Sequence, residues 1–299
     1  MSEVLKVENL RTYFHTKDGK LPAVDGVSFS LEAGKVLGIV GESGCGKSVT
    51  SLSIMGLLPP QTTEILPGSS VKLMGEELVG KSNREMCKIR GDKIAMIFQD
   101  SMTSLNPVMR VGDQLMETIR VHRKLTKKQA KQEAVAMLKK VGIPNPEARM
   151  KNYPHEMSGG MRQRVMIAMA LSCSPSVLIA DEPTTALDVT IQAQILHLMQ
   201  NLIKDFDTSI LFITHDLGVV AEMADRVVVM YTGQIVEEAD VYTLFHNPKH
   251  PYTQGLLNST INVQQQEDEL EPIAGTVPSL SNLPKGCRFH PRCKYCMEI

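Results

Sequence analysis

The first forty residues alternate between hydrophobic and polar positions, as half-buried β-strands do. The stretches VLKVENL and AVDGVSFSL show this alternation, and the polar turns KDGK and EAGK bound the short strands that it predicts. Residues 36–40, VLGIV, form a continuous apolar run and predict a buried strand. A glycine-rich loop follows, and residues 48–58 then have helical spacing, up to a stop expected at Pro59 and Pro60. The chain therefore begins with strands and leads into a strand, loop and helix unit.

The pattern changes twice further along the chain. Residues 61–98 return to strand-like text that ends in KIAMIFQ, whereas residues 112–125 and 127–142 have apolar positions at intervals of three and four, as amphipathic helices do. We interpret residues 100–172 as a helical insertion.

After residue 175, apolar strands and helices alternate. The run VLIA ends in DEPTTALD, the helix IQAQILHLMQNLIKDF follows, and the strand ILFITHD precedes the helix LGVVAEMAD and a final hairpin, RVVVMYTGQIVEE. Such alternation predicts a parallel sheet. Beyond about residue 240 the text is irregular and rich in proline, so we place an appended segment there.

Composition narrows the class of protein. The 299 residues are 42% hydrophobic and 22% charged, with a formal net charge of -1, which is typical of a soluble globular chain and gives no basic signal for nucleic acid. The N-terminus lacks the pattern of a signal peptide, and no apolar stretch reaches the roughly 18 residues of a membrane span. We expect a cytosolic chain that reaches a membrane only through a partner.

The loop GESGCGKS fits the phosphate-loop pattern G-x-x-x-x-G-K-[ST] at every fixed position. Its glycines let backbone N–H groups point inward, and the following helix presents its positive end to phosphates. Lys47 can bridge the β- and γ-phosphates, and the Ser48 hydroxyl can bind Mg²⁺. The candidate nucleotide-binding residues here are Gly41, Glu42, Ser43, Gly44, Cys45, Gly46, Lys47, Ser48 and Val49.

Polar residues at strand ends supply the remaining chemistry. Asp181 and Glu182 follow the apolar run VLIA, which suits Asp181 to a Mg²⁺ ligand, directly or through water, and Glu182 to polarising the attacking water. His215 also follows an apolar strand and could contact the γ-phosphate. Gln99 could bind Mg²⁺ or orient water. Taken alone, His215 is equally consistent with a structural role, and Gln99 with a surface amide.

A second glycine-rich segment, MSGGMRQR at residues 157–164, opens a helix with no phosphate of its own. The N–H groups of Ser158, Gly159 and Gly160 and the helix dipole form an anion site.

The ordered set GESGCGKS, Gln99, SGGMRQR, VLIADEP, TALD and His215 resembles the nucleotide-binding subunit of an ABC transporter over residues 1–240. The resemblance implies an α/β fold: a P-loop NTPase (RecA-like) core with a mixed sheet, an antiparallel β subdomain, an inserted α-helical subdomain and an irregular C-terminal extension. It implies a head-to-tail pair, in which residues 157–161 cap the ATP held by the other subunit. The family's usual sequence at this segment is LSGGQ, whereas residues 157–161 of this chain are MSGGM, with methionine at the first and last positions.

The same resemblance assigns further roles. Asp188 in TALD belongs to a loop at the dimer interface, and Phe14 or its neighbour Tyr13 stacks on adenine, Phe14 being favoured because Tyr13 points to the opposite strand face. The implied partners are a second ABC ATPase, identical or related, two transmembrane permease subunits and an extracytoplasmic solute-binding protein. The implied location is the cytoplasmic face of the membrane, with ATP and Mg²⁺ bound.

The C-terminal text, from HNPKHPYTQGLL to GCRFHPRCKYC, resembles the extension of oligopeptide, dipeptide and nickel importer ATPases. In that family the cysteines can bind an iron–sulphur cluster, [4Fe-4S], and Cys287 and Cys293 match the spacing, whereas Cys296 does not align. Thiolates at this spacing also fit zinc or no metal. Three thiolates do not complete a four-thiolate cluster, and we expect residues 241–299 to be a truncated extension.

Three alternatives remain open on the sequence. Nickel or another small solute is the first, in place of a peptide. A non-transport ABC ATPase acting on DNA or ribosomes is the second, although the 58 residues between Gln99 and Ser158 are too few for long coiled-coil heptads and the chain has a single cassette without a basic block. A cluster-binding redox protein, supported by the terminal cysteines only, is the third.

Overall fold

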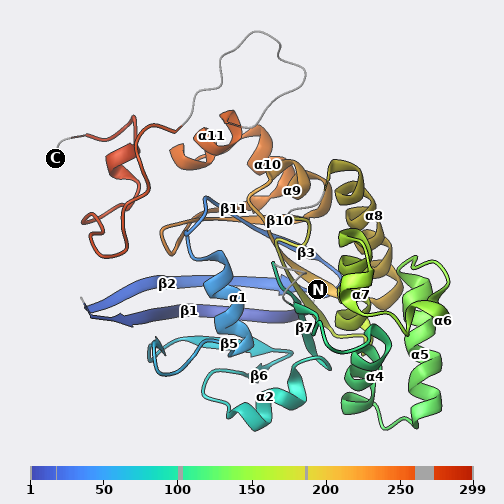
Figure 1. The fold of residues 1–299 in the computed structure, drawn as a ribbon. Helices are drawn as coiled ribbons and strands as arrows, with labels where there is room; N and C mark the ends of the chain where they lie inside the picture. The colour runs from blue at the N-terminus through green and yellow to red at the C-terminus, as the bar shows by residue number, and fades with distance from the viewer. Residues whose placement is uncertain (1, 18, 100–103, 186–187, 260–272, 298–299) are drawn as a thin grey trace. The chain divides into compact units, whose positions relative to one another are not determined.

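The computed structural model describes residues 2–17, 19–99, 104–185, 188–259 and 273–297, and Figure 1 draws them as a ribbon. The chain divides into two compact units. One unit comprises residues 81–211, and the other comprises residues 2–80 together with 212–299. None of the helices in these described ranges has the length and apolar character that a membrane crossing requires.

The two-segment unit contains an antiparallel sheet, as the fold class predicts. Strands β1 (Glu3–Thr16) and β2 (Gly19–Glu32) pair along their length, and β4 (Thr63–Ile65) and β5 (Ser70–Leu73) both pair with β1, while β6 (Glu76–Glu77) pairs with β5. Figure 1 shows β1 and β2 as two long neighbouring strands. Each strand has 14 residues and is longer than expected, because the pairing continues through half-exposed, polar residues.

The same unit contains a mixed sheet that positions the phosphate loop. Strand β3 (Val36–Val40) is parallel to β10 (Arg226–Tyr231), which is antiparallel to β11 (Gln234–Asp240). The loop after β3 leads into α1 (Lys47–Met55). This helix ends before the predicted proline stop: Gly56 adopts a left-handed conformation at φ 60°, and the N–H of Leu57 donates to the carbonyl of Leu52.

Helices also occupy part of the text predicted to be irregular. Beyond residue 240, α10 (Val241–His246) and α11 (Pro251–Asn258) begin at the side-chain caps Asp240 and His250, and a short 3₁₀ helix, η2, spans His290–Arg292. A buried apolar cluster anchors this segment to β10, and it includes Tyr231, Tyr252, Leu244 and Phe289. The fully buried strand β9 (Ser209–Ile213) contains the boundary between the units, and α9 (Leu217–Met223) follows it.

The unit of residues 81–211 carries the predicted helices. They are α4 (Val111–His122), α5 (Lys127–Lys140), α7 (Gly159–Leu171) and α8 (Val189–Phe206). The short helix α6 (Pro146–Arg149) and a 3₁₀ turn, η1, at Pro154–Glu156 were not predicted. Strands β7 (Ile94–Ile97) and β8 (Val177–Asp181) pair in parallel. The helix α2 (Asn83–Ile89) was not predicted from periodicity, although its capping box, Ser82 with Glu85, is a local start signal.

Candidate functional site

The phosphate loop has a backbone that only glycine can adopt at two positions. Gly41 has φ +151°, and a Cβ there would lie 2.2 Å from the carbonyl oxygen of Met230. Gly46 has φ +102°, and its Cβ would lie 2.5 Å from the carbonyl oxygen of Ala23. Because both obstacles are backbone atoms, neither can move aside cheaply. The fixed glycines of the pattern thus have a steric cause in this fold.

The loop ends at the N-terminus of α1, which no side chain caps. Gly46 is the N-cap residue, so the first N–H groups of the helix are directed toward the loop without a competing side-chain acceptor. Lys47 is 5% exposed, and its Nζ donates to the carbonyl oxygens of Gly41 at 2.7 Å and of Glu42 at 3.1 Å. The ammonium group is therefore held inside the loop, where a phosphate oxygen could replace these carbonyls.

The remaining loop residues differ in exposure. Ser43 and Gly44 are exposed, Ser48 and Val49 are half-buried, and Cys45 is buried. Burial raises the pKa of the Cys45 thiol, so this side chain stays neutral. The exposed edge of the loop is where a ligand can approach.

Near the N-terminus, the two candidate adenine-stacking residues lie on β1 and are both half-buried. The Tyr13 hydroxyl donates to Asp25 at 3.2 Å, and burial, together with the charge of Asp25, raises the pKa of this phenol. The ring of Tyr13 is thus tied to β2 through its hydroxyl. No such tie is available to Phe14, so the choice between them stays a prediction.

His215 lies in the same unit as the phosphate loop. It is exposed and follows β9, where the N–H of Thr214 donates to the carbonyl of Ile39 at 3.2 Å. Since Ile39 is next to the end of β3, His215 and the phosphate loop both follow the carboxyl ends of neighbouring segments of chain. Asp216, directly after it, caps α9.

In the unit of residues 81–211, the structure brings Gln99 and Glu182 into direct contact. The Gln99 Nε2 donates to a Glu182 carboxylate oxygen at 2.9 Å, and the Thr185 hydroxyl donates to the same oxygen at 3.0 Å. Glu182 has φ +47°, a left-handed conformation that is unusual for a non-glycine residue and is often kept at functional positions. Asp181, the last residue of β8, is 3% exposed.

The oxygen donors predicted for Mg²⁺ suit that ion. The Asp181 carboxylate is buried, and hydroxyl, amide and carboxylate oxygens are the ligands that Mg²⁺ prefers. The predicted donors belong to different units, Ser48 to residues 2–80 and Gln99 and Asp181 to residues 81–211, so their sharing of one ion stays a prediction. When bound, the ion would neutralise charge on the phosphates.

The second glycine-rich segment begins α7 as predicted. Ser158 is the N-cap residue and its Oγ accepts the N–H of Met161 at 3.3 Å, while Met157 is buried and Ser158 is exposed. The first turn of α7 contains no acidic residue. Its N–H groups therefore form an exposed, electropositive helix terminus.

The segment is packed against the start of α8. Asp188 caps that helix by accepting the N–H of Ile191 at 2.9 Å, and a Cβ on Gly160 would lie 2.9 Å from Ile191 Cγ2. Ile191 thus contacts both segments: its N–H donates to Asp188, and its side chain lies against Gly160. The structure places together two segments that the sequence reasoning had connected only through the family resemblance.

The three C-terminal cysteines do not gather at a metal site. Cys287 and Cys296 are exposed and Cys293 is half-buried. Across the parts of the chain that the structure describes, no group of three or more His, Cys, Asp or Glu side chains is placed to hold a metal ion. The thiols as arranged here do not fit an iron–sulphur cluster.

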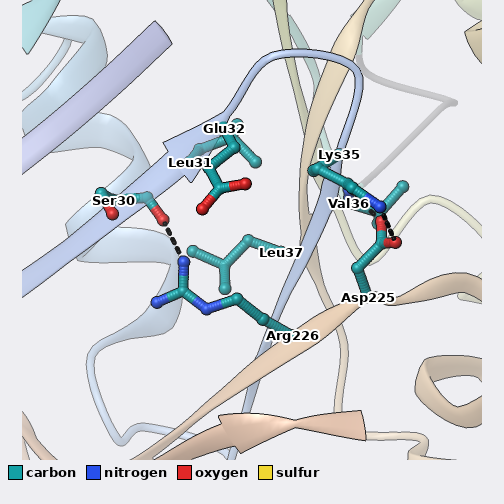
Figure 2. A pocket seen from close by; sticks show the side chains of 8 residues that line it. All are labelled: Ser30, Leu31, Glu32, Lys35, Val36, Leu37, Asp225 and Arg226. Atoms are coloured by element: carbon teal, nitrogen blue, oxygen red, sulfur yellow. Dashed lines mark hydrogen bonds and ion pairs between the residues drawn. The ribbon is translucent and has the colours of Figure 1, made fainter. Parts of the chain in front are cut away.

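A cavity of about 240 Å³ lies at the other end of β3 from the phosphate loop (Figure 2). Its polar groups bind one another: Lys35 Nζ lies 2.8 Å from Asp225, and Arg226 donates to the Ser30 carbonyl at 3.4 Å. None of the predicted site residues lines it. In parallel sheets ligands bind at the carboxyl ends of strands, which is the opposite end.

Sequence reasoning missed two residues that hold the phosphate loop. Tyr252 and Arg292 both contact Glu42, although they lie 210 and 250 positions away along the chain. No local pattern signals such a contact, since Tyr252 reads as part of an irregular segment and Arg292 as one of several C-terminal basic residues.

Comparison with known proteins agrees with this geometry. The family model described as ABC transporter matches residues 24–185, and the model described as oligopeptide/dipeptide transporter, C-terminal region, matches residues 236–299. The chain is 56% identical to the oligopeptide transport ATP-binding protein AppD of Bacillus subtilis, over 100% of this chain and 90% of that protein. It is 54% identical to the dipeptide transport ATP-binding protein DppD of the same species, over 100% of this chain and 89% of that protein.

Solved structures give the same result for the fold. The dimeric structure of MJ0796, a bacterial ABC transporter cassette, superposes with a TM-score of 0.70 at 26% identity, over 79% of this chain and 98% of that one. The expected α/β P-loop NTPase fold is confirmed. The chain belongs to the ABC transporter family and is one of its ATP-hydrolysing, ATP-binding subunits.

Proposed function

We propose that this chain is the energy-coupling subunit of an importer for dipeptides or oligopeptides. The observation that carries the proposal is that the similarity runs through the whole chain, including residues 236–299, to proteins named as oligopeptide and dipeptide transport ATP-binding proteins. This similarity favours a peptide over nickel as the solute. It also favours the domain division predicted above: residues 1–240 as the nucleotide-binding domain, and residues 241–299 as the extension.

Two copies of the ATPase, identical or related, would share each nucleotide. The phosphate loop of one subunit would hold ATP, and the exposed start of α7 in the other would complete the binding of its γ-phosphate. Ser158, Gly159 and Gly160 suit this role because their helix terminus faces solvent and carries no acidic residue. ATP would then join the two subunits, and hydrolysis would release them.

The chemistry would be divided among few side chains. Lys47 would stabilise charge on the β- and γ-phosphates, and Ser48, Asp181 and Gln99 would hold Mg²⁺. Glu182 would polarise the attacking water, with Gln99 and Thr185 keeping its carboxylate oriented through the hydrogen bonds at 2.9 and 3.0 Å. His215 would contact the γ-phosphate.

The partners in this proposal are a second ABC ATPase, two transmembrane permease subunits and an extracytoplasmic solute-binding protein, with the ATPase pair at the cytoplasmic face of the membrane. The Gln99 loop and the helices of residues 100–172 would accept a helix from a permease subunit. Residues 100–103 of this loop lie outside the described residues. No iron–sulphur chemistry is proposed, since the three thiols do not fit a cluster.

The test of the mechanism is the variant Glu182→Gln. We expect ATP affinity to be retained and turnover to fall about a thousandfold, because an amide cannot accept the water proton. The amide can still bind Gln99 and Thr185, so the loop should keep its shape. The variant should form an ATP-dependent pair, measured by sedimentation with and without Mg-ATP.

The matched control is Glu147→Gln, which removes an exposed carboxylate on α6 of the same unit. It should hydrolyse ATP at the rate of the unmodified chain. Unchanged hydrolysis in Glu182→Gln would remove this residue from the catalytic role. Co-purification of the intact complex, followed by uptake of labelled di- and oligopeptides in vesicles, tests the solute, and nickel uptake alone would overturn the peptide assignment.

A further inference from the structure

Every polar group of Glu42 is engaged in the structure. Glu42 occupies an open position of the phosphate-loop pattern, directly after Gly41. Its N–H donates to the Tyr252 hydroxyl at 2.8 Å, its carbonyl accepts from Lys47 at 3.1 Å, and its carboxylate accepts from both Nη atoms of Arg292 at 2.7 and 3.2 Å. Two of these three side chains, Tyr252 and Arg292, lie far along the chain. The phosphate loop is therefore braced by the C-terminal segment.

Arg292 is itself fixed in place. Its side chain is 4% exposed, and beyond Glu42 it donates from Nε to the Ala274 carbonyl at 3.0 Å and from Nη2 to the Ile273 carbonyl at 3.3 Å. Burial acts to lower the pKa of this guanidinium, but hydrogen bonds to Glu42 and Tyr231 outweigh it and raise the pKa. A buried, bidentate arginine of this kind has little freedom to adopt another pose.

An aromatic cluster holds Tyr252 and the segment of Arg292 in the positions from which they contact Glu42. The rings of Tyr231, Tyr252 and Phe289 lie with centroids 4.7 to 5.4 Å apart, and all three are buried. Phe289 belongs to the same short segment as Arg292, and Tyr252 belongs to α11. The ring packing thus fixes the position of the Tyr252 hydroxyl, which accepts from the Glu42 N–H, and of the segment that carries the Arg292 guanidinium, which donates to the Glu42 carboxylate.

We propose that Arg292 is a positioning residue for nucleotide binding, which acts by neutralising the carboxylate of Glu42. This rests on the proposed role of the phosphate loop. A carboxylate inside a loop that must bind polyphosphate repels its ligand, unless a cation compensates the charge. Arg292 supplies that cation and draws the carboxylate toward the C-terminal segment, while Tyr252 holds the backbone at the same residue. The loop then presents a net positive field from Lys47 and the N-terminus of α1.

The experiment is a double-mutant cycle on the full chain, with the dissociation constant for Mg-ATP measured by calorimetry. Arg292→Gln should weaken ATP binding about tenfold, since it leaves the Glu42 charge uncompensated beside the ligand. The double variant, Glu42→Gln with Arg292→Gln, should return to within about twofold of the unmodified chain. Glu42→Gln alone completes the cycle: it leaves the Arg292 charge uncompensated beside the ligand and should bind ATP more tightly than the unmodified chain.

The control is Lys294→Gln, which removes the same charge from an exposed residue two positions away. It should bind ATP normally. A purely structural role for Arg292 predicts instead that the double variant binds as poorly as Arg292→Gln, and this result would overturn the proposal. Normal binding by Arg292→Gln would also overturn it.

Two further measurements keep the outcomes distinct. Should Arg292→Gln fail to fold, Arg292→Lys keeps the charge without the bidentate geometry, and it should bind ATP better in the Glu42→Gln background than alone. Lys47→Ala tests the phosphate loop separately. If Lys47→Ala loses ATP binding while Arg292→Gln binds normally, the positioning role of Arg292 is rejected and the proposed function is retained.

Discussion

The two glycine-rich anion sites of this chain differ in what holds them. In the phosphate loop, Lys47 is buried and bonded within the loop, two glycines lie against backbone carbonyls, and Glu42 is held by residues more than 200 positions away. In residues 157–161, Ser158 is exposed and bonds only its own helix among the contacts seen at its side chain in the described structure. One site is held by residues far along the chain, whereas the other is a helix N-cap that packs against the neighbouring helix α8.

This difference matches the roles proposed for them. A loop that must surround phosphates needs a fixed shape before the ligand arrives, because ordering it on binding would weaken affinity. A helix terminus that only completes a partner's site needs to be accessible and correctly charged. The loop should therefore control nucleotide affinity in an isolated chain, and residues 157–161 should control pairing and turnover.

The largest expected difference between the two sites is the effect of Lys47→Ala and of Ser158→Ala on ATP affinity. Lys47→Ala should raise the dissociation constant for ATP about a hundredfold, since it removes a charge-assisted contact to phosphate from a buried position. Ser158→Ala should leave the affinity of the isolated chain within about twofold. Both are measured by calorimetry at a concentration where the chain is monomeric, and equal losses in the two variants would refute the division of roles.

A negative charge placed at Ser158 tests whether residues 157–161 bind the partner's γ-phosphate. Ser158→Asp keeps an N-cap acceptor for the N–H of Met161 but adds a negative charge that should repel the partner's γ-phosphate. We expect unchanged ATP binding by the isolated chain and about a tenfold loss of turnover in the pair. Ser158→Asn, which caps without charge, is the matched control and should lose far less. ATP-dependent pairing is measured in a Glu182→Gln background, and persistence of that pairing with Asp at 158 would contradict the proposal.

The same contrast decides how much could be predicted from sequence. The start of α7 is a local feature: a serine followed by glycines and a helical pattern gives both the N-cap and the anion site, and the structure has Ser158 at that cap. The long helices α5 and α8 were likewise predicted, because 14 and 18 residues give periodicity room to show. Helices α2, α10 and α11 have six to eight residues, too few for a clear period.

The parts that were missed depend on distant contacts. The phosphate loop was found from its fixed positions, but its brace was not, because Tyr252 and Arg292 carry no signal that refers to Glu42. The lengths of β1 and β2 were also underestimated: Phe14 pairs with Leu21 in text that alternates poorly, where the neighbouring strand decides the outcome. The early end of α1 at Met55 depends on one glycine, Gly56, that the sequence reasoning placed inside the helix.

The smallest expected effect concerns the helix that carries Tyr252 to the phosphate loop. His250 caps α11, with Nδ1 accepting the N–H of Tyr252 at 3.1 Å, and this requires the neutral ring. Burial lowers the pKa of His250 below its ordinary value of 6.5, and nearby Glu237 only partly opposes this.

Because the folded pKa is depressed, the cap contributes stability above about pH 6.5, and the contribution is lost as the pH falls through the folded pKa. The groups near His250 are the Glu237 carboxylate, which accepts a hydrogen bond from the backbone N–H of His250 at 2.9 Å, and the Phe289 ring, whose centroid lies 5.6 Å from that of the imidazole. His250→Asn keeps a capping side chain that does not titrate. It should therefore lose about 0.5 kcal/mol less stability than the unmodified chain between pH 7.5 and 5.5, a value at the low end for an N-cap. Thermal unfolding at the two pH values measures this, with the exposed His246→Asn as control, and identical pH dependence in His250→Asn and the unmodified chain would show that the cap does not titrate in this range.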